Sequence, residues 1–340
     1  MAVTISDVAN EAGVSKSTVS KVLNHWSTIS PATVAKVEEA IEKLHYTPNS
    51  RAVSFAKQTT NNIVYLTNLA KDSAYENPHM FDIMCGVQYS LAKKGYSLSL
   101  VDISDESYPG KKVSQVITSK CCDGLIIHGS ATDHENAEQL INESFPHIII
   151  GHPNVDSALC WIDTNHALAG EYAANHMLAC GYTNVAFIGG QKTDYISAQR
   201  LKGFTQHMAY KGMRVPSSYI GFTDSNHKNS YEVMLNLIDT IPHLQGVVCE
   251  DNTIAVGVVK AIHERGLHIP NDIAVLTFDI YPYSKMIDPK LTIININVYD
   301  MGVQAGQHLI RKLKNPELLI QSYTTLPELI QGDSTIPLDS

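Results

Sequence analysis

A short polar stretch near the N-terminus carries side chains that could bind nucleic acid. In SKSTVSKVLN, Lys16, Ser17 and Lys21 point away from the apolar stripe of a predicted helix. Cationic, hydroxyl and amide groups at a helix N-terminus suit DNA phosphates and the base edges of a major groove. The other short hydrogen-bonding side chains of this stretch are Ser15, Thr18, Ser20 and Asn24. The pattern therefore predicts a helix that contacts DNA.

A second group of polar side chains follows apolar segments in the C-terminal part of the chain. His152 stands in GHP and Asp279 in TFD. Glu250 and Asp251 stand in CED, and Arg200 lies in the helix predicted after FIGG. A guanidinium can bind vicinal hydroxyls or a carboxylate with paired donors, and carboxylates accept from sugar hydroxyls. Because ligands of α/β proteins bind beyond the carboxyl ends of parallel strands, these positions predict a small-molecule site.

Catalytic motifs are missing from the sequence. It contains no GxSxG, HExxH, GxxxxGK[ST] or complete GxGxxG motif. His128-Gly129-Ser130 follows a predicted strand, but no acid partner for it is identified. The six cysteines are scattered without a CxxC pair, which fits a reduced compartment and fits neither a zinc module nor a disulfide scaffold. We therefore expect no enzyme activity, no cofactor and no metal site.

Three short helices are predicted to position the first polar group. Thr4 is a plausible N-cap of the first helix, and Gly13 supplies the left-handed position that ends it. Ser15 caps the second helix, and Ser30, followed by a proline, begins the third. Apolar residues at three- and four-residue spacing give each helix an inward face. Two helices joined by a glycine-containing turn predict a helix-turn-helix.

The second polar group is predicted to lie on an α/β framework. Short apolar segments alternate with amphipathic ones, which is typical of parallel sheets that are covered on both faces by helices. A second cycle of this pattern begins near residue 185, so two lobes with doubly wound parallel sheets are expected. The predicted strands are NIVYLTNL, YSLSLVDI, DGLIIHGS, HIIIGHP, VAFIGG, GVVCED and IAVLTFD.

The composition fits this picture. The 340 residues are 44% hydrophobic and 17% charged, which is typical of globular proteins. The net charge is −9, but residues 1–60 hold six Lys or Arg against five Asp or Glu, so the acidity belongs to the remainder. The chain starts without a signal-peptide pattern, and no apolar run reaches the length of a membrane span. These features predict a cytoplasmic protein with no membrane partner, associated with the nucleoid when it is bound to DNA.

The segments TISDVANEAGVSKSTVSKVLN and SPATVAKVEEAIEKLHYTPN, with much of the remaining chain, resemble the LacI/GalR family of transcriptional regulators. The resemblance implies that Lys16, Ser17 and Lys21 contact operator bases. Lys21 departs from the arginine usual in the family and lacks the planar fork for bidentate contact with guanine. The residues implied to contact DNA phosphates are Thr4, Ser6, Ser15, Thr18, Ser20, Asn24, Ser30 and Thr33.

The same resemblance implies a periplasmic-binding-protein-like sensor with an effector between its lobes. It implies three domains: a headpiece at 1–47, a hinge helix or linker at 48–60, and an effector-binding and dimerisation domain at 61–340. Within the last, we expect an N-lobe of about 61–161 plus 292–321 and a C-lobe of about 162–291 plus 322–340. The chain is expected to cross between the lobes near 161–163, 290–293 and 321–323.

Arg200, Asp279 and Glu250 are implied to reach the effector. Asp251 matches a family position that is often structural, so we expect it to be structural here. Relatives commonly have asparagine where Glu250 stands, and aromatic pairs where His79 and Met80 stand. Stacking on a sugar ring could come instead from three other aromatic residues. These residues are Tyr195, Trp161 and Tyr281, and the predicted effector set is Arg200, Asp279, Glu250, His79, Met80, His152 and Tyr195.

The segment PNSRAVSFAK is predicted to form a hinge helix that folds on operator DNA. Ala52, Val53 and Phe55 are its expected minor-groove residues. Phe55 takes the place of the family's inserted leucine, and apolar wedges, phenylalanine included, can unstack a base step and kink the duplex. Val53 stands where many relatives have arginine.

Together these features predict a homodimeric regulator, by default a repressor, on a pseudo-palindromic double-stranded operator. A carbohydrate is the first expectation for the effector, with a purine or a sugar phosphate acting as corepressor as the alternative. A sugar-binding protein without DNA regulation is a further alternative. The headpiece and the missing signal peptide argue against it.

Overall fold

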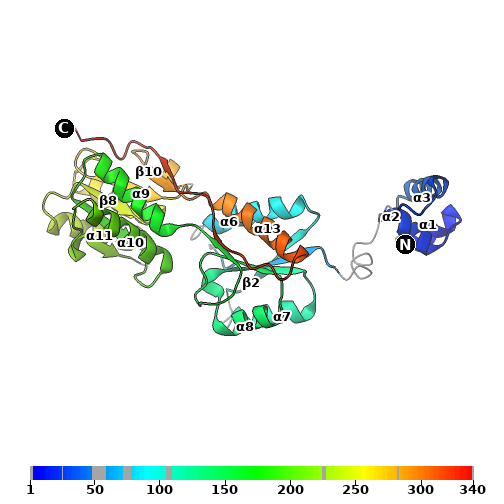
Figure 1. Ribbon diagram of the computed structural model, residues 1–340. Helices are drawn as coiled ribbons and strands as arrows, with labels where there is room; N and C mark the ends of the chain where they lie inside the picture. Colours follow the sequence, from blue (N-terminus) through cyan, green and yellow to red (C-terminus); the bar gives the residue numbers. More distant parts are fainter. Residues whose placement is uncertain are drawn as a thin grey trace. The chain divides into compact units, whose positions relative to one another are not determined.

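A computed structural model describes residues 3–24, 26–47, 59–71, 78–104, 109–223, 227–281 and 283–338 (Figure 1). The chain forms two compact units. One comprises residues 1–61 with 121–123, and the other comprises residues 62–120 with 124–340. The predicted hinge residues Ala52, Val53 and Phe55 lie outside the described residues.

The first unit contains a three-helix headpiece that matches the predicted helices. Val8, Val19 and Val37, one from each helix, have no exposed surface and form the centre of its core. Gly13 has a φ of 64°, so it ends the first helix in the left-handed conformation that glycine adopts without strain. The helices are α1 (Ile5–Ala12), α2 (Lys16–Leu23) and α3 (Pro31–Lys43).

The second unit is built on two six-stranded sheets, which we call the first and second lobes. The first sheet is parallel throughout and has the order β11-β5-β4-β3-β1-β2. Its strands are β1 (Asn62–Thr67), β2 (Ser97–Asp102), β3 (Gly124–His128), β4 (His147–Ile150), β5 (Trp161–Asp163) and β11 (Gln321–Tyr323). Its helices are α6 (Pro78–Ala92), α7 (Pro109–Ser119), α8 (His134–Asn142) and α13 (Val298–Lys314). Helices α6 and α13 pack on one face, and α7 and α8 lie on the other (Figure 1).

The second sheet has the order β12-β10-β9-β8-β6-β7 and is parallel except for β12, which runs antiparallel to β10. Its strands are β6 (Val185–Gly189), β7 (Ile220–Phe222), β8 (Gly246–Cys249), β9 (Ala274–Phe278), β10 (Thr292–Asn295) and β12 (Glu328–Ile330). Its helices are α9 (His166–Ala179), α10 (Tyr195–Tyr210), α11 (His227–Thr240) and α12 (Asn252–Glu264). Helices α9 and α10 pack against each other, as do α11 and α12. Each pair faces its own buried apolar cluster.

The chain passes between the lobes at short strands. It leaves the first sheet after β5 and enters α9, returns from β10 to α13, and leaves again between β11 and β12. The sheets therefore place β10 in the second lobe, although the sequence assigned residues from 292 onward to the first. They also place all of β5 and β11 in the first lobe. The sheet that a crossover strand joins depends on its pairing with distant strands, which its own apolar pattern does not show.

Candidate functional site

The candidate DNA-reading face lies on α2. Lys16, Ser17 and Lys21 are all exposed, whereas Val19 and Val22 on the other side of the helix are buried. The structure therefore leaves the three predicted base-contacting side chains free of the headpiece core. The Nζ atom of Lys21 lies 5.8 Å from the centre of the Trp26 ring.

Most of the predicted phosphate-contacting residues lie at helix N-termini, whereas Ser20 lies within α2 and Asn24 is its C-cap. The Thr4 amide and hydroxyl donate to Asp7 at 2.8 Å each, which forms the capping box of α1. The Ser15 Oγ accepts from the Thr18 amide at 3.1 Å, and the Ser30 Oγ accepts from the Thr33 amide at 3.3 Å. Helix N-termini present unpaired N–H groups and a positive partial charge, so these positions suit anions. All eight predicted residues, with Ser6, Ser20 and Asn24 completing the set, are exposed or half-buried.

Trp26 was not among the predicted DNA contacts. Its side chain is 56% exposed, which is unusual for so large an apolar group on a small domain. The only sequence signal for it is its place five residues after Lys21, outside the helical pattern. Its neighbour on α2 is Lys21, which the sequence predicts to contact a DNA base.

In the second lobe, the structure brings together Arg200, Asp279 and Glu250, three of the residues that the sequence assigns to the effector. Arg200, on α10, donates from Nη2 to the Asp279 Oδ2 at 2.9 Å and from Nη1 to the Glu250 carbonyl at 2.6 Å. Both side chains of the Arg200–Asp279 pair are 3% exposed. Burial disfavours the charged form of Arg200, but the nearby carboxylates outweigh it and raise its pKa. The guanidinium is thus fixed as a cation beside its carboxylate.

Glu250 and Asp279 are held differently. The Glu250 carboxylate accepts from the Gly190 amide and the Ser197 hydroxyl, so it fixes the loop after β6 to α10. Burial raises the pKa of Glu250, although the Arg200 charge opposes this. Asp279 has a φ of 64°, a left-handed conformation that is uncommon for a residue with a side chain. Its Oδ1 atom is buried without a hydrogen-bond partner. Such a strained, incompletely bonded carboxylate is typical of a ligand site.

His79 of the first lobe contacts this second-lobe cluster. Its ring stacks on Tyr281 with centroids 4.3 Å apart, and its Nε2 atom lies 3.6 Å from the Asp279 Oδ2. Burial lowers the pKa of His79, and the Asp279 charge opposes this. We call His79, Arg200, Glu250, Asp279 and Tyr281 the interlobe cluster.

A second contact between the lobes involves His152 and Tyr195. Their rings stack with centroids 4.5 Å apart, and Trp161 lies 5.3 Å from His152. Burial is the main cause that raises the pKa of Tyr195 to about 12, so its hydroxyl stays protonated. Tyr195 and Tyr281, which the sequence suggests for stacking on a sugar ring, therefore stack on His152 and His79 in this structure.

Met80 and Asp251 have other contacts. Met80 packs in the first-lobe core, where its sulfur lies 3.9 Å from the Tyr65 hydroxyl. Asp251 is the N-cap of α12 and accepts from the Ile254 amide at 2.7 Å, which is the structural role that the sequence predicts for it. Burial raises the pKa of Asp251 to about 7.

Sequence reasoning missed several buried polar residues between the lobes. Asn252 donates from Nδ2 to the carbonyls of Phe278 and Asp279 at 2.7 Å, so it holds the strained backbone of Asp279 in place. Asp163 and His166 were also missed, and His128 was considered only as part of a catalytic arrangement without an acid partner. Asp163 and His128 end β5 and β3, and His166 begins α9. The available signal for Asp163 and His166 was their position at or just after the end of a strand.

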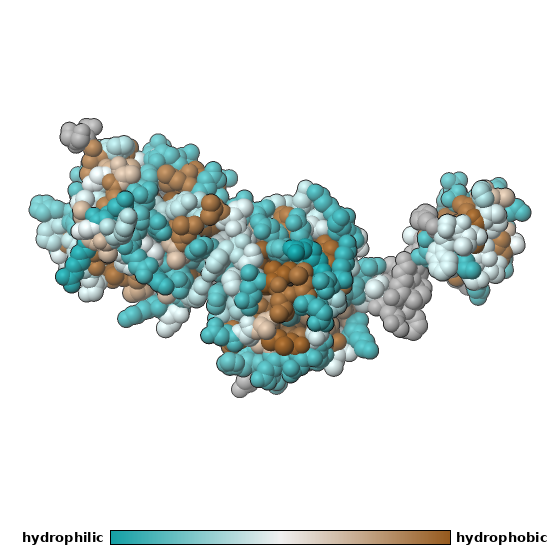
Figure 2. All heavy atoms as spheres, in the orientation of Figure 1, coloured by the Kyte–Doolittle hydropathy of each residue, from teal (hydrophilic) through white to brown (hydrophobic). Residues whose placement is uncertain are grey.

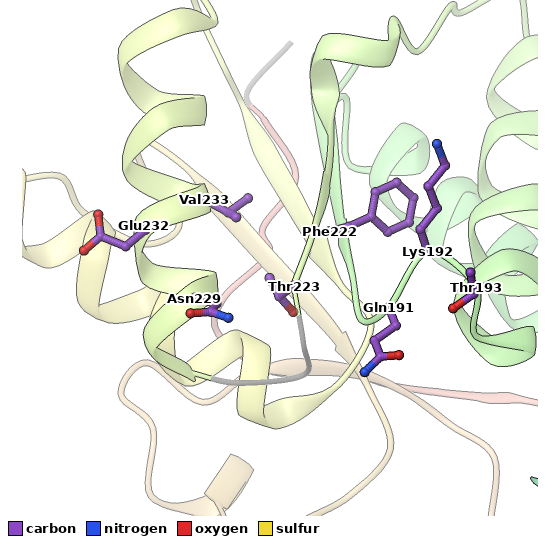
Figure 3. Close-up of a pocket in the computed structure, with 8 residues that line it drawn as sticks. All are labelled: Gln191, Lys192, Thr193, Phe222, Thr223, Asn229, Glu232 and Val233. Atoms are coloured by element: carbon purple, nitrogen blue, oxygen red, sulfur yellow. The ribbon is translucent and has the colours of Figure 1, made fainter.

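A pocket of about 630 Å³ opens on the second lobe beside the ends of β6 and β7 (Figure 3). Figure 3 shows Glu232 extending from α11 away from the other labelled side chains. None of the seven predicted effector residues lines this pocket, although Glu250 binds Gly190 just before it. Its lining residues are Gln191, Lys192, Thr193, Phe222, Thr223, Asn229, Glu232 and Val233.

The described part of the chain contains neither a metal-binding cluster nor a membrane-spanning helix. No group of three His, Cys, Asp or Glu among the described residues could hold a metal ion. None of the described helices combines the length and the hydrophobicity needed to cross a membrane.

Comparisons with known proteins identify the family. Residues 4–49 match the model for bacterial regulatory proteins of the lacI family, and residues 174–335 match the periplasmic binding protein-like domain. The HTH-type transcriptional regulator RegA of Clostridium saccharobutylicum is 30% identical over 339 residues, covering 99% of this chain and 100% of RegA. The chain belongs to the LacI family. Members of this family are DNA-binding transcriptional regulators rather than enzymes, as the sequence predicts.

Two further LacI-family proteins cover nearly the whole chain. The ribose operon repressor of Escherichia coli (strain K12) is 29% identical over 333 residues, or 97% of this chain and 99% of the repressor. The structure of the lac repressor dimer bound to operator and the anti-inducer ONPF matches with a TM-score of 0.82 at 21% identity. That match covers 99% of this chain and 100% of the other. The likeness confirms the predicted fold: a helix-turn-helix headpiece and a two-lobed α/β domain.

Proposed function

We propose that this LacI-family regulator is a repressor whose operator affinity is controlled by a small effector bound at the interlobe cluster. The observation that carries the proposal is the buried Arg200–Asp279 pair. Asp279 keeps a strained backbone and an unpartnered oxygen there. A ligand that donates to Asp279 would satisfy this oxygen.

A carbohydrate is the effector class that the cluster favours. Vicinal hydroxyls can donate to the Asp279 carboxylate and accept from Arg200, and the rings of His79 and Tyr281 offer apolar faces. The ribose operon repressor, similar over the whole chain, is named for a sugar operon. A purine or a sugar phosphate acting as corepressor is the alternative.

The remaining parts of the proposal concern DNA binding and assembly. Residues 1–47 serve as the DNA-binding headpiece, 48–60 as the hinge, and 61–340 as the effector-binding and dimerisation domain. Lys16, Ser17 and Lys21 contact bases, the eight predicted phosphate-contacting residues bind the DNA backbone, and Phe55 enters the minor groove. The protein acts in the cytoplasm as a homodimer. Support for a dimer comes from large exposed apolar groups on the first lobe, including Phe81 at 59% and Leu100 at 44% exposure.

A mobility-shift assay with the protein's own promoter region tests the regulator. Lys21→Ala should weaken operator binding by about 1–3 kcal/mol, because it removes a base contact in each half-site. Lys202→Ala, which changes an exposed lysine on α10, serves as the matched control. DNA binding that is insensitive to sequence and unaffected by Lys21→Ala would contradict the proposal.

The effector is tested by a thermal-shift screen of sugars, sugar phosphates and nucleobases. A bound effector at a hundredfold excess over its Kd should stabilise the protein by about 2.7 kcal/mol. Asp279→Asn should abolish this shift and the effect of the ligand on DNA binding. Glu232→Gln, which alters the surface pocket instead, should retain both. A ligand whose binding depends on Glu232 and not on Asp279 would place the effector site in that pocket.

A further inference from the structure

Asp163 is a buried carboxylate that the interlobe cluster does not use. It ends β5, and its side chain is 3% exposed. Its Oδ1 atom accepts from the Thr164 amide at 2.8 Å and lies 3.2 Å from the His166 Nε2. Its Oδ2 atom is buried with no hydrogen-bond partner. An unpaired carboxylate oxygen in the interior costs stability, so a binding partner that is absent from the free protein would explain it.

The surroundings of Asp163 belong to both lobes. In the first lobe, β11 pairs beside β5, and the Oγ1 atom of Thr324, just after β11, is also buried without a partner. From the second lobe, Tyr195 is close enough for the Asp163 charge to contribute to its raised pKa, after the larger effect of burial. Burial lowers the pKa of His128, and the Asp163 charge opposes this effect. Two unpartnered oxygen atoms therefore lie where the lobes meet.

The charges near these atoms determine what could bind there. Burial lowers the pKa of His128, so its ring is neutral near pH 7. Arg200, the buried cation of the neighbouring cluster, already donates to Asp279 and to the Glu250 carbonyl. Asp194 and Asp163 both act on His128, so the local field is acidic. A phosphate or carboxylate would meet unpaired carboxylate oxygens there, which is repulsive, whereas a hydroxyl or an ammonium group could donate to them.

We propose that Asp163 and Thr324 form a second polar subsite, the Asp163 subsite, which binds a hydrogen-bond-donating, non-anionic group of the effector. The inference rests on the proposed function, because the same effector donates to Asp279 at one end and to Asp163 at the other. The donor is a hydroxyl or a protonated amine. The subsite thereby selects neutral or amino-substituted polyhydroxyl compounds over their phosphorylated and carboxylated derivatives.

The test uses the full-length protein and matched carbohydrate sets. Each set contains a neutral sugar, its amino sugar, its uronic acid and its 6-phosphate, and binding is measured by isothermal titration calorimetry. In any set that binds, the neutral or amino member should bind at least about tenfold more tightly than both anionic members. Asp163→Asn should weaken the favoured member by about ten- to a hundredfold. If Asp163→Asn loses more affinity for the amino sugar than for the neutral sugar, the donor is an ammonium group. If the two affinities fall equally, the donor is a hydroxyl.

Two controls separate binding from folding. Asp239→Asn changes an exposed carboxylate on α11 and should leave every affinity unchanged. The ligand-free Asp163→Asn protein should melt at the same temperature as the unmodified protein or higher, because the substitution removes a buried charge and keeps the oxygen that accepts from Thr164. A lower melting temperature with equal loss for all ligands would assign Asp163 a purely structural role and overturn the subsite.

The outcomes also separate the subsite from the proposed function. If carbohydrates bind but Asp163→Asn binds them unchanged, or if an anionic member binds best, the Asp163 subsite is wrong and the carbohydrate effector stands. If no carbohydrate binds, the proposed effector class is wrong, and the subsite fails with it.

Discussion

At the scale of single residues, the interlobe cluster places one fixed cation among several carboxylates. Arg200 uses two of its nitrogen atoms within the protein, so it orients Asp279 while its Nε atom remains unpartnered. Asn252 holds the Asp279 backbone, and Glu250 holds the loop that leads to α10. The cluster is therefore assembled before any ligand binds, which reduces the ordering cost of binding.

His79 gives this cluster a pH dependence with a definite sign. Burial lowers its pKa below about 6.5, the ordinary value for histidine. The packed state thus favours the neutral ring, so the contribution of His79 to stability is complete above the ordinary pKa and is lost as the pH falls. Arg200, Asp82, Asp279 and His166 also act on the ring.

The variant His79→Phe keeps a ring on Tyr281 but does not titrate. Between about pH 7.5 and pH 5, the melting temperature of the unmodified protein should fall further than that of the variant. His263→Phe, on the exposed face of α12, should behave like the unmodified protein. If the melting temperatures of the unmodified protein and His79→Phe fall equally with pH, His79 does not respond to pH in this range.

At the scale of elements, α9 and α10 carry the site because they pack unusually closely. A Cβ atom added to Gly170 on α9 would lie 2.0 Å from the Arg200 carbonyl, and one added to Gly203 on α10 would lie 1.8 Å from the Ala167 carbonyl. Only glycine fits these two positions, and the close packing fixes the helix from which Arg200 and Tyr195 project. Because the atoms that an added Cβ would meet belong to the backbone, the larger residue could be accommodated only by moving the two helices apart.

Gly170→Ala should therefore force the two helices apart. We expect a destabilisation of about 1–3 kcal/mol in urea unfolding, the usual cost of overpacking. Because Arg200 would move with α10, the effector-induced thermal shift should also decrease. Gln206→Ala, on the exposed face of α10, should change stability by less than about 0.5 kcal/mol. An unchanged free energy of unfolding for Gly170→Ala would mean that the helices can separate without loss of stability.

The sequence predicted the central strands of the sheets well and the crossover strands poorly. Apolar runs such as VAFIGG and GVVCED became β6 and β8, and the caps at Ser15 and Ser30 were correct. The crossover strands β5, β10 and β11 join a sheet through pairing with strands distant in sequence, which a local apolar pattern does not show, so the lobe boundaries shifted there. Asp163 was missed for the same reason, because it ends a strand that the sequence did not reveal. Pairings such as His152 with Tyr195 join residues far apart in sequence, and only the fold brings them together.

At the scale of the whole molecule, the chain joins a helix-turn-helix headpiece to a two-lobed α/β unit, for which we propose a response to a ligand. The headpiece offers only Lys16 and Lys21 as exposed cations on α2, which is little charge for tight DNA binding by one copy. The first lobe presents a continuous apolar area on its visible face (Figure 2). Exposed apolar surface of this kind marks a surface for association, so the proposed homodimer would supply the second headpiece.

Operator symmetry tests this arrangement. Once footprinting has defined the operator, scrambling one half-site should lower the affinity by about 10²–10⁴-fold, because the second headpiece then adds only nonspecific contacts. Scrambling an equal number of base pairs outside the footprint should have no effect. Inserting about five base pairs at the centre should be as harmful as losing a half-site, because it rotates the two halves by half a helical turn. Tight binding to an isolated half-site would show instead that a single headpiece is sufficient and that assembly serves the effector response alone.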